Sequence, residues 1–191
     1  MESAYRLTAI PLAAGSSRRF GGRKLLHPFS DGAPIGIHSA RTLSTVLANT
    51  IAVVSADDVA LVKRFVDQGL EVVINSEADT GMASSLVAGV QASKDSDGWL
   101  IMLADMPWVR QQTIQTLVDQ LVAGASLVAP VYQGRRGNPV GFSAKWFDAL
   151  SGLKGDTGAR QLLRQNSHEL FLLEVEDPGV LKDVDYPDDL E

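Results

Sequence analysis

Apolar residues along this chain fall into two patterns, short continuous runs and longer stretches in which they recur every three or four positions. Six short runs are bounded by polar or turn-forming residues, at positions 6–13, 50–55, 71–74, 99–104, 127–131 and 169–175. Most are apolar without alternation, which is typical of strands covered by helices on both faces of a parallel sheet. The pattern therefore predicts six strands.

The stretches between these runs carry helical stripes of apolar side chains. They comprise Val59, Leu61, Val62, Phe65 and Val66; Leu86, Val87 and Val90; and Ile114, Leu117, Val118, Leu121 and Val122. Strands that alternate with helices predict a three-layer α/β/α fold with a Rossmann-like, mostly parallel sheet. With 191 residues and no repeat or linker, we expect one domain over 1–191.

Ligands bind such sheets outside the carboxyl ends of the strands. The chemistry is therefore expected in the loops at 14–24, 55–58, 75–85, 105–108 and 132–141.

Composition narrows the possible chemistry. The chain has a formal net charge of -6 and no cysteine, which excludes disulfides, thiolate metal sites and cysteine nucleophiles. The acidic balance argues against broad binding to nucleic acid or to a membrane surface, which depends on summed positive charge. The three histidines lack metal-ligand spacing, and no G-x-S-x-G motif occurs. We expect a cytoplasmic protein.

Residues 12–24, LAAGSSRRFGGRK, place three glycines and four cations (Arg18, Arg19, Arg23 and Lys24) directly after the first predicted strand. Glycines let backbone N–H groups approach a ligand, and clustered amides with Arg19 and Lys24 suit a polyphosphate. The spacing matches neither a Walker A loop nor the G-x-G-x-x-G dinucleotide fingerprint. The alternative is a glycine-rich turn whose cations face solvent.

The full pattern of this loop, L-A-A-G-x-S-x-R-x-G-x-x-K, resembles the signature of the MobA-like nucleotidyltransferases and most closely their molybdenum cofactor cytidylyltransferase branch. It is filled by Leu12, Ala13, Ala14, Gly15, Ser17, Arg19, Gly21 and Lys24. The resemblance implies a nucleotidyltransferase fold of the GT-A-like kind. It also implies that the loop wraps a nucleoside triphosphate, with Arg19 and Lys24 on its phosphates, and the Ala13-Ala14-Gly15 segment resembles the cytidylyl type.

Two aspartates are candidate metal ligands. Asp105 ends the apolar run 99–104 and is followed by Met106-Pro107, so it either holds Mg²⁺ or caps a helix that Pro107 opens. The resemblance favours the metal, because the family carries the same Asp-Met-Pro motif, and it implies catalytic roles for Arg19, Lys24 and Asp105. Asp185 lies in the segment 183–190, which reads alone as an acidic helix start. The resemblance implies that Asp185 completes a site for Mg²⁺, with Mn²⁺ as the alternative.

Two further groups have both a structural and a functional interpretation. Ser84 or Ser85 suits a helix N-cap, whereas the resemblance implies nucleotide contacts by Asn75, Gly81, Ser84 and Ser85. The segment 133–140 has the glycines and proline of a turn, and GDTGAR at 155–160 leads into a helix. For these two segments the resemblance implies an acceptor site formed by Asn138, Pro139, Asp156 and Arg160.

The resemblance thus implies a Mg²⁺-dependent enzyme that transfers CMP from CTP to molybdopterin or its metal-loaded form, with release of pyrophosphate. A related enzyme that uses GTP, another nucleoside triphosphate or a sugar-phosphate acceptor is one alternative. The other is a non-catalytic nucleotide-binding accessory protein, whose protein partner would be a molybdenum hydroxylase. No nucleic-acid or membrane partner is expected.

Overall fold

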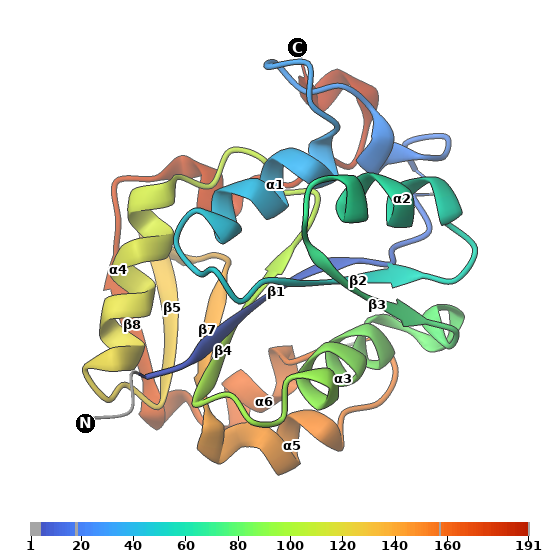
Figure 1. Ribbon diagram of the computed structural model, residues 1–191. Coiled ribbons are helices and arrows are strands. Elements are labelled where there is room, and N and C mark those ends of the chain that lie inside the picture. Colours follow the sequence, from blue (N-terminus) through green and yellow to red (C-terminus); the bar gives the residue numbers. More distant parts are fainter. Residues whose placement is uncertain (1–4, 18, 157, 191) are drawn as a thin grey trace.

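The computed structural model describes residues 5–17, 19–156 and 158–190, so Arg18 and Thr157 of the motifs above lie outside the described residues. Its strands form one sheet, drawn edge-on between two layers of helices in Figure 1. The strands are β1 (Leu7–Ala13), β2 (Ile51–Ser55), β3 (Glu71–Asn75), β4 (Gly98–Leu103), β5 (Leu127–Tyr132), β6 (Arg135–Arg136), β7 (Val140–Ser143) and β8 (Leu170–Glu174). All six predicted strands are present, and each end lies within one residue of its prediction.

The sheet is mixed, with the strand order β3-β2-β1-β4-β7-β5-β6 and with β8 paired to β5. Parallel pairing joins β3 to β2, β2 to β1, β1 to β4 and β5 to β8. The strand β7 is antiparallel to both of its neighbours, β4 and β5. Strands β1 to β5 therefore all run in one direction, and their carboxyl ends lie at one edge of the sheet, as predicted.

Helices cover both faces of the sheet (Figure 1). One face carries α1 (Ile35–Ser44), α2 (Val59–Asp67) and α4 (Gln111–Val122), and the other carries α3 (Met82–Ala92), α5 (Phe147–Ser151) and α6 (Arg160–Gln165). The three predicted stripes form α2, α3 and α4. Short 3₁₀ turns occur at Lys24–Leu26, Ala78–Thr80, Ala144–Trp146, Ser167–Glu169, Pro178–Leu181 and Pro187–Leu190.

The core follows from this layering, because β1 is buried along its whole length and has apolar side chains on both faces. On the α3 side, Trp99 and Phe142 are fully buried. On the other side, Phe65 of α2 and Leu117 of α4 are fully buried. Each such side chain contributes about 1.5–3 kcal/mol relative to exposure.

Two capping interpretations from the sequence are wrong. Gly81, not Ser84 or Ser85, is the N-cap of α3, because Ser84 lies inside the first turn and its hydroxyl donates to the Gly81 carbonyl at 2.8 Å. Asp105 does not cap α4, which begins at Gln111. The carboxylate at the start of α4 belongs to Asp177, which accepts hydrogen bonds from the Arg110 amide and the Thr113 hydroxyl.

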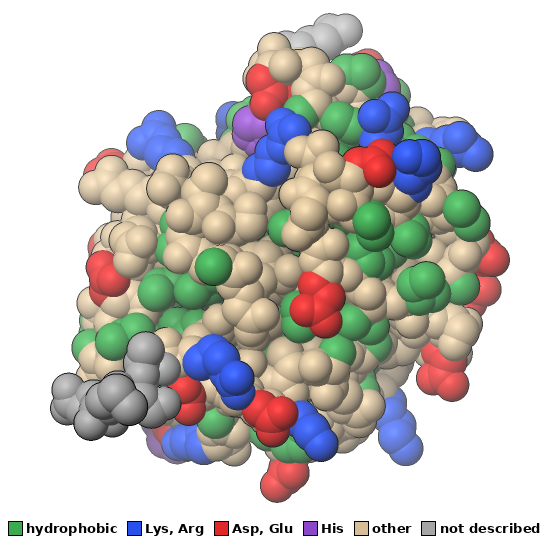
Figure 2. Space-filling model, in the orientation of Figure 1, with side chains coloured by type: hydrophobic (Ala, Val, Ile, Leu, Met, Phe, Trp, Pro, Cys, Tyr) green, Lys and Arg blue, Asp and Glu red, His purple; other side chains and the backbone are tan. Residues whose placement is uncertain are grey.

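The surface is mixed in charge. On the face drawn in Figure 2, Lys and Arg side chains are interspersed with Asp and Glu. Within the part of the chain that the structure describes, no helix has the length and apolar character that crossing a membrane requires.

Candidate functional site

A cleft of about 860 Å³ opens at the carboxyl edge of the sheet, beyond the ends of β1 to β4. Ten of the residues singled out in the sequence line it: Leu12, Ala14, Gly15, Ser17, Arg19, Lys24, Gly81, Ser85, Asp105 and Asp156. A smaller pocket of about 290 Å³ shares Ser17, Arg19 and Lys24 and adds Asp185. The structure thus gathers the predicted cations and both predicted metal ligands around adjoining cavities.

The loop after β1 turns on residues with left-handed backbone. Gly21 and Gly22 have φ values of 87° and 107°, and Ser17 and Arg23 have φ values of 50° and 44°. The Gly22 amide donates to the Ser17 carbonyl at 3.1 Å, which closes the loop. Positive φ is readily adopted by glycine, so the glycines explain how this short segment can reverse direction and deliver Lys24 to the cleft.

Lys24 and Asp105 form a buried ion pair at the bottom of the cleft. Lys24 Nζ lies 2.7 Å from Asp105 Oδ2, and the two side chains are only 10% and 19% exposed. Burial raises the pKa of the Asp105 carboxyl above its usual range, and the Lys24 ammonium opposes this shift only in part. A second acid, Asp183, raises this pKa further. The charged form of the Asp105 carboxyl is therefore poorly solvated, and a further cation beside it would stabilise that form.

The second oxygen of Asp105 is the observation that fits a metal ion. Among the described residues, Asp105 Oδ1 and Ser151 Oγ are the buried side-chain oxygens without a hydrogen-bond partner. A buried, unsatisfied carboxylate oxygen is costly unless something else binds it. No group of three or more His, Cys, Asp or Glu side chains suited to a metal occurs within the described ranges. Mg²⁺ needs no such group, since one or two carboxylates and substrate phosphates commonly hold it.

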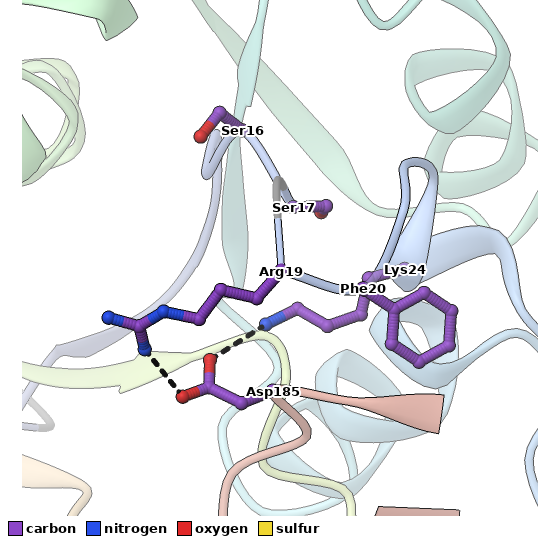
Figure 3. Close-up of a pocket in the computed structure, with 6 residues that line it drawn as sticks. All are labelled: Ser16, Ser17, Arg19, Phe20, Lys24 and Asp185. Atoms are coloured by element: carbon purple, nitrogen blue, oxygen red, sulfur yellow. Dashed lines mark hydrogen bonds and ion pairs between the residues drawn. The ribbon is translucent and has the colours of Figure 1, made fainter. Parts of the chain in front are cut away.

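Asp185 approaches the same cations from the C-terminal segment (Figure 3). Its Oδ2 lies 2.7 Å from Arg19 Nη1, and its Oδ1 lies 4.0 Å from Lys24 Nζ. The segment is fixed by a backbone hydrogen bond of 2.9 Å from the Val184 amide to the Asp105 carbonyl. Asp189, in the 3₁₀ turn that follows, accepts hydrogen bonds from the Asp185 amide and the next amide along the chain. The first loop, the end of β4 and the C-terminal segment thus converge on Lys24.

The predicted nucleotide residue Asn75 is engaged within the turn that follows β3. Its Nδ2 donates to the hydroxyl oxygens of Ser84 and Ser85, each at 2.9 Å, and its Oδ1 accepts from the Glu77 amide. Asn75 and Ser84 do not line the cleft, whereas Ser85 and Gly81 do. Asn75 therefore contributes to the cleft indirectly, because its hydrogen bonds hold the turn that carries Gly81 and Ser85.

Gly81 allows a distant segment to close one end of the cleft. Its φ is 120°, and a Cβ placed on it would lie 2.5 Å from Asp156 Oδ1 and 2.6 Å from the Gly155 carbonyl. The Gly155 oxygen also accepts a hydrogen bond from the Ala83 amide at 3.0 Å. Only glycine fits this approach, which positions Asp156 on the cleft wall.

The remaining predicted residues lie away from the cleft. Ala13 is buried in the core, and Gly21 is exposed in the loop. Asn138 and Pro139 are joined by a cis peptide bond, and the Asn138 amide donates to the Val180 carbonyl. Arg160 is exposed at the start of α6. None of these residues lines the two cavities described above.

The sequence assigned no ligand to several cleft residues, although their loops were expected to carry the chemistry. Arg23 and Ser16 extend the cationic side of the cleft. Asp57, Asp58 and Asp79 line it elsewhere and, with Asp156, make an acidic wall. Their positions directly after predicted strands were the available signal. Asp58 also caps α2, since its Oδ1 accepts from the Leu61 amide at 3.2 Å.

Comparison with known proteins decides the family. The sequence model of the MobA-like NTP transferase domain matches residues 9–170. The chain belongs to this family. The family predicted from the loop motif is confirmed, and the assignment to its cytidylyltransferase branch stays a prediction.

Curated relatives of this MobA-like protein carry different names. The purine catabolism protein PucB of Bacillus subtilis (strain 168) is 32% identical over 99% of this chain and 96% of its own length. Nicotine blue oxidoreductase of Paenarthrobacter nicotinovorans is 29% identical over 94% and 92%. A probable molybdenum cofactor guanylyltransferase of Bacillus mycoides (strain KBAB4) is 25% identical over 69% and 64%.

A solved relative has the same fold over nearly its whole length. Rv0371c from Mycobacterium tuberculosis H37Rv has a TM-score of 0.84 and 28% identity, covering 98% of this chain and 96% of its own. Its complex with manganese has a TM-score of 0.80 and 26% identity, over 96% and 95%. The names of the relatives differ, so the MobA-like fold alone does not assign a substrate.

Proposed function

We propose that this MobA-like protein is a divalent-metal-dependent nucleotidyltransferase that transfers CMP from CTP to a phosphorylated acceptor, molybdopterin or its metal-loaded form. The observation that carries the proposal is the convergence of Arg19, Lys24, Asp105 and Asp185. Two cations and two carboxylates, with one buried oxygen unsatisfied, suit a ligand that brings both phosphates and a metal ion. The molybdenum link rests on the resemblance of the first loop and on the guanylyltransferase relative.

The reaction requires alignment rather than a general base. An oxygen of the acceptor phosphate attacks the α-phosphorus of the triphosphate, and the bond from that phosphorus to the bridging oxygen breaks. Pyrophosphate leaves with the electron pair. A phosphomonoester has a second pKa near 6, so its oxygen is already anionic at neutral pH. The enzyme must bring two anions together and stabilise the charge that grows on pyrophosphate.

Arg19 and Lys24 supply that stabilisation. Both extend from the first loop toward one carboxylate in Figure 3, and the glycines of the loop allow backbone amides to approach the same phosphates. Arg19 contacts Asp185, and Lys24 contacts Asp105. A triphosphate that binds Arg19 and Lys24 therefore has to replace these carboxylates as their ion-pair partners.

The two carboxylates are the residues that would hold Mg²⁺, or Mn²⁺ in its place. The orphaned Oδ1 of Asp105 fits this role, and the manganese complex of Rv0371c is consistent with it. When bound, the ion would neutralise phosphate charge and orient the phosphates. Asp185 and Asp105 are close enough to share Lys24 as an ion-pair partner, so they can face one ligand together.

The acidic wall orients the nucleotide along the cleft. Asp57, Asp79 and Asp156 repel phosphates and accept hydrogen bonds, so they favour ribose hydroxyls or a base amino group at their end. The triphosphate then lies at the end that contains Arg19 and Lys24. This arrangement supports a nucleotide substrate, and the Ala13-Ala14-Gly15 segment supports CTP among the candidates.

The decisive experiment is a panel of CTP, GTP, ATP and UTP with Mg²⁺ and purified molybdopterin, scored by pyrophosphate release. Release with CTP at a rate at least tenfold above the others supports the proposal. Release with GTP alone would assign the alternative nucleotide. Binding of a nucleotide without pyrophosphate release, for every acceptor including sugar phosphates, would instead identify a non-catalytic accessory protein.

A further inference from the structure

Three arginines outside the cleft lie on one face of the sheet. The first two, Arg160 and Arg164, are four positions apart on α6 and therefore lie on the same side of that helix. Leu163 of α6 is buried in the same core cluster as Ala129 of β5 and Val140 of β7. The helix α6 therefore packs on this face of the sheet, at the β5–β7 region.

The third arginine, Arg136, projects from the same face. It lies directly opposite Val131 in the antiparallel pair of β5 and β6. Opposed residues in such a pair point to the same side of a sheet. Val131 and Ala129 are two positions apart on β5, so their side chains also point to one side. Because Ala129 packs in one core cluster with Leu163 of α6, Arg136 points toward the side that α6 covers.

The three guanidinium groups repel one another without a compensating acid. Partial burial lowers the pKa of Arg136, and the charges of Arg160 and Arg164 lower it further. Within the described parts of the chain, no ion pair joins any of the three to a carboxylate. Arginine clusters of this kind are the usual receptors for phosphate and carboxylate groups.

The cluster adjoins the cleft through the segment that precedes α6. Asp156 lines the cleft, and Gly158 lies against Met82, with Met82 Sδ 3.3 Å from the position of a Cβ on Gly158. Arg160 follows two residues later. On the other side, Arg136 is followed at once by Gly137 and by Asn138, whose amide is bound to the Val180 carbonyl. Asp156 on the cleft wall thus lies four positions before Arg160, at the start of the helix that carries two of the three arginines.

We propose that Arg136, Arg160 and Arg164 form an anion-binding subsite for the acceptor, which takes an anionic group other than the phosphate that attacks CTP; this rests on the transferase function proposed above. The acceptor is then a small molecule with two separated anionic groups. One end reaches the α-phosphate beside Lys24, and the other is held by the arginines. This arrangement would place the acceptor across the wall that Asp156 forms.

The first test titrates inorganic phosphate into the protein while a non-hydrolysable CTP analogue with Mg²⁺ fills the first loop. The Nε–H signals of the three arginines, assigned through single variants, are followed by NMR. We expect them to shift together along one saturable curve. In R160Q/R164Q, the remaining Arg136 signal should need about 10–100-fold more phosphate, the scale of a lost charge-assisted pair. Absence of a saturable shift in the wild type would overturn the subsite.

The second test measures steady-state kinetics with CTP and molybdopterin. R160Q/R164Q should raise the KM for the acceptor about 10–100-fold and leave the KM for CTP within twofold. The matched control R64Q/K94Q removes the same charge from two exposed positions on α2 and after α3, and both constants should stay within twofold. An unchanged acceptor KM in R160Q/R164Q would refute the subsite.

The two tests also separate this inference from the transferase proposal. If no acceptor yields pyrophosphate with the wild type, the transferase proposal fails, and the phosphate titration still decides whether the arginines bind an anion. If pyrophosphate is released but phosphate produces no saturable shift, the transferase proposal stands and the subsite fails.

Discussion

Lys24 Nζ and Asp105 Oδ2 lie 2.7 Å apart although 81 positions separate the two residues in the chain. The contact joins the loop after β1 to the end of β4, which are neighbouring parallel strands. It occurs where little solvent screens charge, so loss of either partner leaves a costly buried ion. The proposed chemistry depends on both members of this pair.

Lys24→Ala should lower the rate of pyrophosphate release by about 10²–10³-fold, the scale for removal of one preorganised charge stabiliser. The measurement is single-turnover kinetics with CTP, Mg²⁺ and molybdopterin as the acceptor. Lys63→Ala is the matched control, because Lys63 is an exposed lysine on α2 that pairs with Asp67. Unchanged turnover in Lys24→Ala would show that the phosphates bind elsewhere.

Asp105→Asn should weaken Mn²⁺ binding in the presence of CTP by at least about tenfold, since even changes next to metal ligands commonly have effects of 10–100-fold. Electron paramagnetic resonance of free Mn²⁺ measures this affinity directly. Asp67→Asn, which neutralises an exposed carboxylate on α2, should leave it unchanged. Equal Mn²⁺ affinity in Asp105→Asn and the wild type would remove Asp105 from the metal site.

Asp185→Asn should have opposite effects with and without metal. In EDTA, CTP should bind about fivefold more tightly, because Asp185 no longer competes for Arg19, and an exposed pair of this kind contributes up to about 1 kcal/mol. With Mg²⁺, CTP should bind more weakly instead, since a ligand of the metal ion is lost. Calorimetry in each buffer provides both numbers, and tighter binding in Mg²⁺ as well would contradict a metal role for Asp185.

Gly81→Ala should destabilise the protein by roughly 2–4 kcal/mol, because the new Cβ would meet Asp156 and Gly155 and the left-handed backbone adds strain. The control is Gly124→Ala. Gly124 has a φ of 101° and open space around a new Cβ, so only the backbone cost of about 1 kcal/mol applies. Urea unfolding compares the two variants, and equal losses would mean that the approach of residues 155–156 contributes nothing.

Glu169 provides a pH-dependent test outside the cleft. Hydrogen bonds from Lys145 and from the Ser126 hydroxyl hold the pKa of Glu169 below its ordinary value of 4.5. The unfolded chain binds this proton more tightly, so the stabilisation is present above pH 4.5 and is lost as the pH falls through the lower folded pKa. The difference in unfolding free energy between wild type and Glu169→Gln should be constant from about pH 6 to 7 and shrink below about pH 4. A difference that does not vary with pH would rule out this linkage.

The sequence predicted β1, β2, β4 and β5 well because burial on both faces leaves a continuous apolar run. It did not predict β7, since Gly137 and Pro139 directly before this strand are strong turn signals. The antiparallel position of β7 between β4 and β5 is a property of the whole sheet, which no local pattern encodes. The helix α6 was missed because six residues are too few to show a helical period.

The candidate site was predictable in part for a related reason. Loop positions followed from the strands, so the neighbourhood of Lys24 and Asp105 was predictable. The acidic wall was not predictable, because Asp57 and Asp79 come to line the same cleft only through the side-by-side pairing of β2 and β3. The partners of Asn75 depend likewise on the angle at which α3 leaves its turn.

The backbone hydrogen bond from Val184 to Asp105 has a consequence for how such proteins diverge. Most substitutions alter side chains and leave amides in place, and proline alone among the standard residues lacks the donor. Substitutions at the surrounding positions therefore leave the spacing between Asp105 and Asp185 largely unchanged. Lineages can remodel the walls for a new base or a new acceptor while inheriting the same pair of carboxylates.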